Sequence, residues 1–329
     1  MIVMSKTVSP QSAWSVDQLV RIHDQPLLNL VYQAATVHRA HHDPNEVQVC
    51  TLLSIKTGGC SEDCAYCSQS ARYETGVSSR RLVGTDEVLA AAREAKRRGS
   101  TRFCMGAAWP KPRTEDDFEN VLEMVRAVRA LGLEACCTLG LLSAEQAKRL
   151  KEAGLTAYNH NLDTGEGYYD QVVTTRTYAD RLATLNRVRD AGISLCCGGI
   201  LGMGEDVTHR LEMLMTLSSL DPPPESVPIN ALVPINGTPL AEQEPVSIWE
   251  MVRMIATTRI VLPLAMVRLS AGRLRMSPEG QALCFLAGAN SIFSGEKLLT
   301  TPNPDRGEDQ ELFQTLGLTA RPAFKQHGH

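Results

Sequence analysis

The stretch Thr-Gly-Gly-Cys-Ser-Glu-Asp-Cys-Ala-Tyr-Cys, residues 57–67, follows a hydrophobic run and is typical of a loop. It places Cys60, Cys64 and Cys67 in a C-x-x-x-C-x-x-C array. Three thiolates this close can bind one inorganic centre and leave a coordination position open, because a tetrahedral zinc ion or a cubane iron–sulfur cluster takes four ligands. A structural zinc site whose fourth ligand lies elsewhere in the chain is one alternative. A loop closed by a disulfide is another.

Around this loop, short β-rich runs alternate with longer amphipathic runs that have helical periodicity. We predict strands at 47–56, 101–107, 133–139, 155–163, 193–200, 226–233, 265–271 and 291–294. We predict helices at 85–98, 114–130, 143–153, 178–191, 207–219, 247–260 and 278–287. Several of these helices are followed by a glycine, as the ends of helices commonly are. Eight strands with helices between them predict the α/β class and a (β/α)8 TIM-type barrel.

The two ends of the chain differ from this alternation. Residues 14–42 carry apolar residues at helical spacing with a break near Pro26, which predicts an N-terminal helical extension that packs on the barrel. The chain after about Asn303 is polar, and we expect it to be irregular. We therefore divide the chain into an N-terminal helical extension (1–45), a barrel (46–302) and a C-terminal tail (303–329).

Composition limits the classes of function. The chain has 329 residues, a formal net charge of −4 and no basic block, so we expect no nucleic-acid partner. The apolar runs near 193–203 and 260–267 fall short of the ~20 residues that a membrane span needs, so we expect no membrane partner. We see no signal peptide and expect a cytoplasmic protein. Ten cysteines in such a protein indicate metal or cluster binding better than disulfides.

Strand alternation predicts which side chains face the inside of the barrel, because successive side chains point to opposite faces. The apolar series of each strand should meet the helices. The other series then brings one cysteine from each of three strands inside, beside Arg268: Cys104, Cys136 and Cys196. A buried, unpaired arginine is costly, and a negatively charged iron–sulfur centre would supply its partner. The alternative is that buried cysteines are small apolar residues. We assign that role to three others: Cys137, Cys197 and Cys284.

Several longer stretches carry a resemblance. They are Leu-Leu-Ser-Ile-Lys-Thr-Gly (52–58), Arg-Phe-Cys-Met-Gly-Ala-Ala-Trp (102–109), Tyr-Asn-His-Asn-Leu-Asp-Thr (158–164), Thr-Thr-Arg-Thr-Tyr (174–178), Val-Pro-Ile-Asn (227–230), Val-Arg-Leu-Ser-Ala-Gly-Arg (267–273) and Leu-Leu-Thr-Thr-Pro-Asn-Pro (298–304). With them the chain, from about residue 14 to residue 320, resembles the biotin synthases. These belong to the radical S-adenosylmethionine (radical SAM) enzymes. The cysteine array alone is a less specific signal.

The resemblance implies an enzyme with two clusters, a sulfurtransferase that converts dethiobiotin to biotin. A [4Fe–4S] cluster on Cys60, Cys64 and Cys67 would cleave S-adenosylmethionine, and the resulting radical would take hydrogen from dethiobiotin. A [2Fe–2S] cluster would donate the sulfur. The resemblance implies four ligands for that second cluster: Cys104, Cys136, Cys196 and Arg268.

The resemblance also implies contacts for the cofactor and the substrate. Tyr66 would lie against the adenine, Asp163 would bind the ribose, and Arg181 would pair with the cofactor's carboxylate. Three further residues would contact the cofactor: Ala107, Asn161 and Ile200. The residues implied for dethiobiotin are Lys56, Asn161, Asn230, Thr300 and Thr301. An electron donor such as flavodoxin or ferredoxin and a homodimer are implied as well. We expect His160, on the outward series, to be a structural histidine with satisfied hydrogen bonds.

Two rival interpretations stay open on the sequence. One is a radical enzyme of similar architecture that does not insert sulfur, such as a maturase or a mutase, which would not need the inward cysteines and arginine. The other is a structural or regulatory protein that binds zinc or one cluster.

Cys50 marks a departure, because the family tends to have serine there. It lies in the inward series of the first strand. We expect it beside Arg268 without binding iron, with Arg268 directed by Arg102, Ser226 and Ser291.

Overall fold

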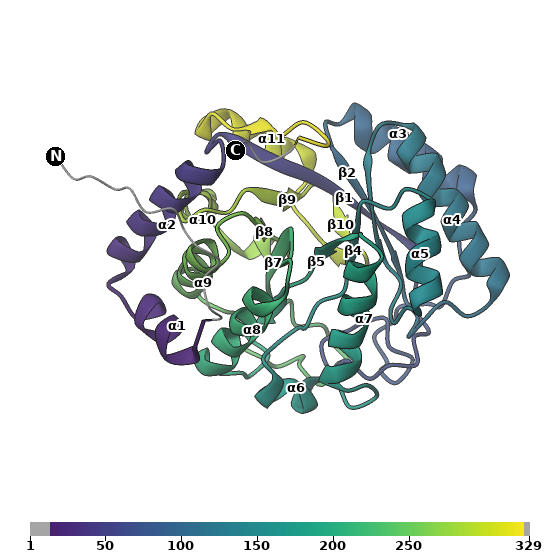
Figure 1. Cartoon of the computed structure of the whole chain (residues 1–329), viewed down its shortest axis with the longest axis horizontal. Helices are drawn as coiled ribbons and strands as arrows, with labels where there is room; N and C mark the ends of the chain where they lie inside the picture. Colours follow the sequence, from purple (N-terminus) through teal and green to yellow (C-terminus); the bar gives the residue numbers. More distant parts are fainter. Residues whose placement is uncertain (1–13, 326–329) are drawn as a thin grey trace.

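The computed structural model describes residues 14–325 and places a closed parallel barrel at their centre (Figure 1). Each barrel strand pairs with the next, and the last strand pairs with the first. The eight strands of this closed path are β1 (Glu46–Lys56), β2 (Arg102–Ala107), β3 (Glu134–Thr138), β4 (Ala157–Asn159), β5 (Ser194–Cys196), β7 (Ser226–Ala231), β8 (Met266–Leu269) and β9 (Ser291–Phe293). The predicted (β/α)8 barrel is confirmed.

The fifth predicted strand is interrupted. It consists of β5 and a second short strand, β6 (Gly199–Leu201), and both pair with β7. The backbone comes very close to β7 at the interruption, because a Cβ atom on Gly198 would lie 2.0 Å from the carbonyl oxygen of Pro228. Only glycine fits this approach. The break frees the Gly198 N–H from the strand ladder, and it donates to the side chain of Asn161 at 3.2 Å.

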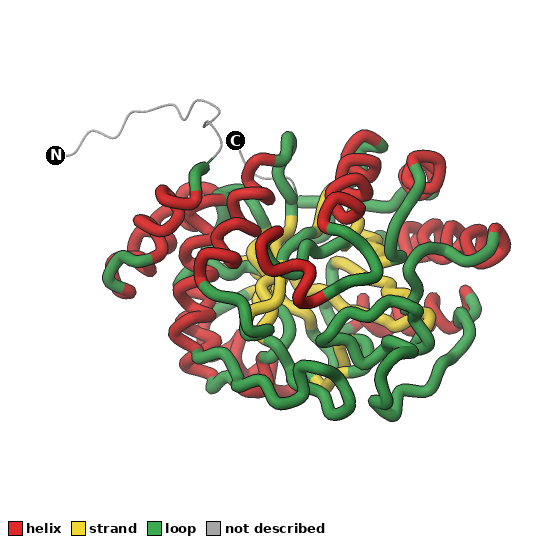
Figure 2. Tube along the Cα trace, turned by 90° about the horizontal axis from the view of Figure 1, so that it is seen from below, coloured by secondary structure: helices red, strands yellow, loops and turns green. Residues whose placement is uncertain are grey.

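Helices surround the strands (Figure 2). Seven lie where the periodicity predicted them: α3 (Thr85–Arg97), α4 (Glu115–Ala130), α5 (Ala144–Glu152), α7 (Tyr178–Asp190), α8 (Val207–Ser219), α9 (Ile248–Val261) and α10 (Pro278–Leu286). Side-chain caps fix several starts; Ser143 and Gln146, for example, form a capping box at α5. The short α6 (Glu166–Val172) and a 3-10 turn (Arg273–Arg275) were not predicted.

The N-terminal helices lie against one side of the barrel, at the left of Figure 1. They are α1 (Val16–His23) and α2 (Leu27–His41), and the break between them falls at Pro26 as predicted. Helix α2 packs mainly on α9, and α1 packs on α8 and α9. Among residues 14–325, no helix is long and apolar enough to cross a membrane.

The expectation of an irregular C-terminal segment is wrong for its described part. Asp305 caps α11 (Arg306–Leu316), and the strand β12 (Thr319–Ala320) pairs with β1. Asp309 of α11 forms a buried ion pair with Arg273, which explains how a polar segment docks on the barrel. A small antiparallel pair, β10 (Lys297–Leu298) and β11 (Thr301–Pro302), precedes the helix. The division at 45 and 302 stays a prediction.

The predicted strand alternation is confirmed. Residues of the outward series, including Phe103, Cys137 and Cys197, belong to the large apolar core between strands and helices. Cys104 and Cys136 belong instead to a small separate cluster inside the barrel. The inside therefore holds the cysteines that the sequence analysis singled out for chemistry.

Candidate active site

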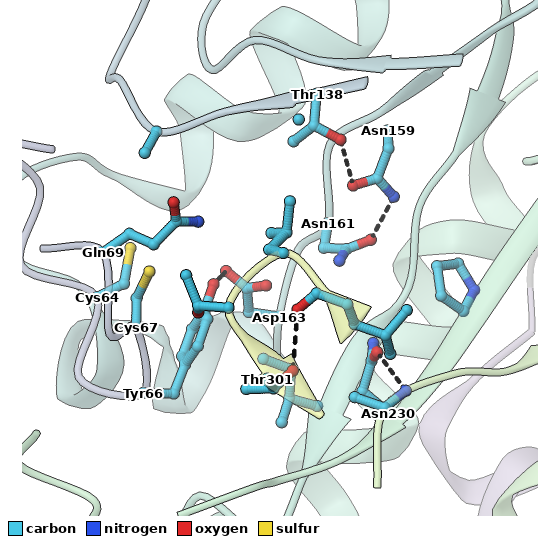
Figure 3. Close-up of a pocket in the computed structure, with 18 of the residues that line it drawn as sticks. Cys64, Tyr66, Cys67, Gln69, Thr138, Asn159, Asn161, Asp163, Asn230 and Thr301 are labelled. Atoms are coloured by element: carbon cyan, nitrogen blue, oxygen red, sulfur yellow. Dashed lines mark hydrogen bonds between the residues drawn. The ribbon is translucent and has the colours of Figure 1, made fainter. Parts of the chain in front are cut away.

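A cavity of about 330 Å³ lies at the carboxyl ends of the barrel strands, where barrel enzymes place their active sites. Figure 3 shows side chains from the cysteine loop and from several strand ends gathered around it. The predicted site residues that line the cavity are Cys60, Cys64, Tyr66, Cys67, Cys104, Ala107, Cys136, Asn161, Asp163, Arg181, Ile200, Asn230, Arg268, Thr300 and Thr301. Cys196 and Lys56 lie outside this lining.

The loop set of cysteines, Cys60, Cys64 and Cys67, follows a tight backbone turn. Gly58 and Gly59 both have positive φ, of 66° and 64°. A Cβ atom on Gly58 would lie 2.9 Å from a backbone oxygen of Ser78, so a larger residue would displace the backbone. The loop turns the three thiols toward one end of the cavity.

Two acidic side chains inside the array fasten the loop to the segment between α6 and α7. The carboxylate of Asp63 accepts hydrogen bonds from the N–H groups of Thr174 (3.0 Å) and Thr175 (3.2 Å). Glu62 accepts one from the Nε of Arg176 (2.9 Å). Burial opposes ionisation of Asp63, but the hydrogen bonds from the two threonines lower its pKa to about 2. The Thr-Thr-Arg stretch thus works as a clamp on the cysteine loop.

Burial favours the protonated form of the thiols of the loop set when no metal is bound. Burial raises the pKa of Cys64 to about 12 and that of Cys67 to about 11, and it raises the pKa of Cys60 as well. Iron binds the thiolate, so cluster assembly on this loop must release protons.

The barrel set of cysteines, Cys104, Cys136 and Cys196, lies deeper. Cys104 and Cys136 are direct neighbours across β2 and β3, and all three side chains are at most 3% exposed. Hydrogen bonds from Cys104 and Cys196 hold the pKa of Cys136 well below its usual range. Asn159 donates to the Sγ of Cys196 at 3.3 Å. Three strands thus bring three sulfur atoms into contact.

The guanidinium of Arg268 lies against the barrel set and is 1% exposed. Its Nη1 donates to the Sγ of Cys196 at 3.6 Å, and its Nε donates to Ser291 at 2.9 Å. Its Nη2 donates to Gln48 and Cys50, at 3.3 Å each. Its partners are therefore a hydroxyl, an amide and two sulfur atoms. The predicted inward positions of Cys50 and Arg268 are confirmed.

Two predicted neighbours of Arg268 form no hydrogen bond with it within residues 14–325. The guanidinium of Arg102 pairs with Glu134 (2.7 Å) and Glu225 (3.1 Å) instead. Ser226 is fully buried, and its hydroxyl finds no hydrogen-bond partner within residues 14–325. The expectation that these two residues direct Arg268 is wrong.

Gln48 binds the guanidinium of Arg268 instead, and the sequence analysis missed this residue. It precedes Cys50 by two residues in the same inward series, so strand alternation could have found it. Burial would raise the pKa of the Cys50 thiol, but a hydrogen bond with Cys104 and the charge of Arg268 lower it to about 7.

Three residues predicted for the cofactor contact one another. Asp163 has a left-handed backbone (φ 70°), and its Oδ2 accepts from the Tyr66 hydroxyl (3.0 Å) and the Arg181 Nη2 (2.6 Å). Arg181 is buried and is not a solvated surface residue. This ionic group faces the cavity beside the loop set (Figure 3).

A chain of amides lies between the cofactor residues and the barrel set. Thr138 donates to Asn159 (3.1 Å), and the Nδ2 of Asn159 donates to the Oδ1 of Asn161 (3.1 Å) (Figure 3). The Gly198 N–H donates to the same oxygen at 3.2 Å. Because two donors engage its carbonyl oxygen, Asn161 offers mainly N–H donors to a bound molecule.

Four of the residues predicted for the substrate line the cavity: Asn161, Asn230, Thr300 and Thr301. Figure 3 shows Asn161, Asn230 and Thr301 around it. The amide of Asn230 donates to the Gly199 carbonyl (2.9 Å) and accepts from the Ala271 N–H (3.2 Å), which fixes its orientation. Thr300 shares a hydrogen bond with Ser68 of the cysteine loop at 2.7 Å, which joins this segment to the loop.

The surroundings of two further residues, Lys56 and His160, were not predicted. The Nζ of Lys56 donates to the carbonyl oxygens of Gly58 and Ala108, the latter at 2.9 Å, so it supports the cysteine loop from behind. His160 is 2% exposed, and within residues 14–325 its Nε2 has no hydrogen-bond partner. The expectation that its hydrogen bonds are satisfied is wrong, and burial holds its pKa well below the usual range.

The donor sets fit iron–sulfur clusters. Both sets consist of free thiols that line or adjoin one cavity. The buried guanidinium of Arg268 lacks a carboxylate among its hydrogen-bond partners, and an anionic cluster would compensate its charge. No group of three or more Cys, His, Asp or Glu side chains in the described part of the chain is gathered as a single metal ion requires.

Comparison with families and curated proteins gives a consistent result. Residues 54–217 match the Radical SAM superfamily, and residues 228–319 match the Biotin and Thiamin Synthesis associated domain. The chain is 62% identical to the biotin synthase of Cytophaga hutchinsonii over 95% of this chain and 93% of that protein. It is 63% identical to the biotin synthase of Gloeobacter violaceus (92% and 96%) and 60% identical to the mitochondrial biotin synthase of Arabidopsis thaliana (95% and 83%).

Comparison with solved structures supports the fold. The structure of methylornithine synthase superposes with a TM-score of 0.79 at 20% identity and covers 95% of both chains. The FeFe-hydrogenase maturase from Carboxydothermus hydrogenoformans gives 0.80 at 17% identity, over 94% of this chain and 76% of that chain. At such identities the likeness concerns the barrel and not the reaction.

Proposed function

The chain belongs to the biotin synthase family of radical SAM enzymes, and from this premise we propose how its residues divide the work of inserting sulfur into dethiobiotin. When bound, a [4Fe–4S] cluster with S-adenosylmethionine supplies a radical able to break unactivated C–H bonds, and a [2Fe–2S] cluster supplies sulfur. The protein has to hold these groups in order, orient the substrate between them and exclude water.

The loop set would hold the [4Fe–4S] cluster. Three thiols leave one iron position for a cofactor, and the clamp through Asp63 and Glu62 fixes the loop from which they project. The neighbouring Asp163, Arg181 and Tyr66 form a polar group suited to the ribose, carboxylate and adenine of S-adenosylmethionine. Ala107 and Ile200 line the same space and would give it an apolar wall.

The barrel set with Arg268 would hold the [2Fe–2S] cluster. Its sulfur atoms lie on three strands whose positions the sheet ladder fixes, and the site is almost closed to solvent. Exclusion of water protects reactive sulfur and radical species from side reactions. The guanidinium of Arg268 already points at Cys196 and would supply the fourth ligand.

Dethiobiotin would lie in the cavity between the two sets. Asn161 and Asn230 present oriented amides that can bind its ureido ring. Thr300 and Thr301 line the cavity, and their hydroxyls would bind its carboxylate. Lys56 would also bind dethiobiotin, with its ammonium group held beside the cysteine loop by the backbone carbonyls of Gly58 and Ala108.

The remaining parts of the proposal rest on the family. They are a flavodoxin or ferredoxin as electron donor, a homodimer as the assembly, a cytoplasmic location and the division of the chain at residues 45 and 302. The observation that carries the proposal comes from the structure itself. Two separate sets of three thiols adjoin one cavity, and a buried arginine faces the deeper set.

The test is anaerobic reconstitution with iron and sulfide, followed by one turnover with reductant, S-adenosylmethionine and dethiobiotin. We expect an absorption spectrum composed of two cluster types, 5′-deoxyadenosine, and biotin formed as the [2Fe–2S] absorbance falls. A single cluster with cofactor cleavage and no biotin would support the radical enzyme without sulfur insertion. A colourless zinc protein would support the structural alternative.

A further inference from the structure

The orientation of Arg268 depends on hydrogen bonds to side chains that belong neither to the loop set nor to the barrel set. Besides Cys196, three side chains form hydrogen bonds with the guanidinium: Ser291, Cys50 and Gln48. Ser291 binds the Nε, which lies on the stem side of the group. Cys50 is a weak acceptor, because sulfur accepts hydrogen bonds poorly. Gln48 supplies the amide oxygen to Nη2 and is therefore the strong acceptor on that side of the guanidinium.

Gln48 is unusually well fixed. It is 3% exposed, and its Oε1 accepts from Arg268 (3.3 Å), from the Ser291 hydroxyl (3.1 Å) and from the Cys50 thiol (3.7 Å). Its Nε2 donates to the carboxylate of Glu134 at 3.3 Å. A reversed amide would face donors with its own N–H groups and a carboxylate with its oxygen, so the surroundings allow one orientation.

Gln48 is uncharged, and this matters because it lies between Arg268 and Glu134. Glu134 is already paired with Arg102, which also binds Glu225. Gln48 stands between that ionic group and Arg268. A carboxylate at this position would form an ion pair with Arg268 and draw it away from the sulfur atoms. An amide orients the guanidinium and leaves it free for another partner.

We propose that Gln48 is the positioning residue that directs Arg268 toward the second cluster. The inference rests on the proposed function, because it assumes a [2Fe–2S] cluster on the barrel set. Gln48 acts through Arg268 and does not contact the substrate. Residues that orient a metal ligand commonly change metal affinity or activity about 10–100-fold when they are removed.

The experiment compares Gln48→Met with Gln281→Met in reconstituted, full-length protein. Methionine keeps the volume of glutamine and removes all four side-chain hydrogen bonds of Gln48. Gln281 is a matched control, since it is also buried and accepts from a buried arginine, Arg273 (3.0 Å), outside the cavity lining. The readouts are the charge-transfer bands of the second cluster and the rate at which a chelator removes its iron.

For Gln48→Met we expect shifted bands and iron loss about 10–100-fold faster, with the loop cluster and Gln281→Met unchanged. A second measurement repeats Gln48→Met in the Arg268→Ala background. There it should add nothing, because the residue it positions is gone. Gln48→Asn, which keeps the amide but shortens its reach, gives the same comparison if the methionine variant fails to fold.

Wild-type bands and iron loss in Gln48→Met would overturn the inference, and so would an equal effect with and without Arg268, which indicates a packing role. If wild-type protein forms no second cluster at all, the proposed function fails before the variants are compared. The two failures are therefore distinguishable.

Discussion

The loop set and the barrel set present three thiols each, yet the protein holds them in opposite ways. The loop set has no strand ladder around its cysteines, and Cys60 and Cys67 are partly exposed. It depends on side-chain clamps from the segment between α6 and α7. The barrel set is placed by strand register and is nearly inaccessible. The difference suits a site that admits a cofactor and a site that shields sulfur from water.

The largest effect is expected when one cysteine of either set is replaced, because the two sets should bind their clusters independently. Cys64→Ala should remove cofactor cleavage, at least about 100-fold, because it removes a ligand outright. It should spare the absorbance of the barrel cluster, since no strand residue changes. Cys136→Ala should do the reverse, and some 5′-deoxyadenosine should form without biotin. Anaerobic spectra and product analysis measure both.

The matched control for this pair is Cys284→Ala, which removes a buried thiol of α10 that belongs to neither set. It should retain both clusters. Loss of both clusters from either Cys64→Ala or Cys136→Ala, in soluble and folded protein, would show that the sets do not assemble separately.

An effect of intermediate size is expected when the clamp between Asp63 and the Thr-Thr-Arg stretch is weakened. Asp63→Asn should lower the free energy of unfolding of the metal-free protein by about 1–3 kcal/mol at neutral pH, because hydrogen bonds to a charged acceptor are lost. The folded-state pKa of Asp63 is lowered, to about 2. Its contribution is therefore present above about pH 4 and is lost as the pH falls toward 2.

Denaturant unfolding of wild type and Asp63→Asn at several pH values tests this prediction. The two curves should converge at low pH. A difference that is constant from pH 7 to pH 2 would mean that the carboxylate is not what the clamp uses. Asp180→Asn is a useful comparison, since Asp180 completes the capping box of α7 and its pKa is also lowered by hydrogen bonds from Thr177.

Sequence patterns predicted the barrel and the barrel set well for a physical reason. Alternation along a strand is strict, so the inward positions of Cys104 and Cys136 followed from the apolar positions beside them. Patterns failed where contacts depend on long side chains. Alternation places Gln48 inside the barrel, but nothing local shows that its amide reaches Arg268 or that Arg102 turns to Glu225. The helix α11 was missed because its docking depends on a buried ion pair, and its sequence is polar.

A smaller effect is expected from Cys196 and Cys197, adjacent residues whose side chains face opposite sides of the sheet. Cys197 follows Cys196 of the barrel set but faces the helices, where it is fully buried in the apolar core. Cys197→Ala should cost on the order of 1 kcal/mol in packing and leave the second cluster intact. Cys196→Ala should abolish that cluster. If the spectrum were lost from Cys197→Ala and kept in Cys196→Ala, the inward register would be off by one residue.

The smallest expected effect concerns Cys50, the fourth sulfur beside the barrel set. Its thiol accepts from Arg268 at 3.3 Å, and its hydrogen-bond contacts extend to Ser291 at 3.9 Å. A serine hydroxyl can make the same two contacts and is the better hydrogen-bonding group.

If Arg268 is the ligand and Cys50 only adjoins it, Cys50→Ser should leave the charge-transfer bands and the biotin yield nearly unchanged, while Arg268→Ala shifts the bands. The opposite pattern, with bands that move in Cys50→Ser and stay in Arg268→Ala, would make Cys50 the fourth ligand. The barrel set would then hold its cluster by four thiolates, and Arg268 would act as a counter-charge.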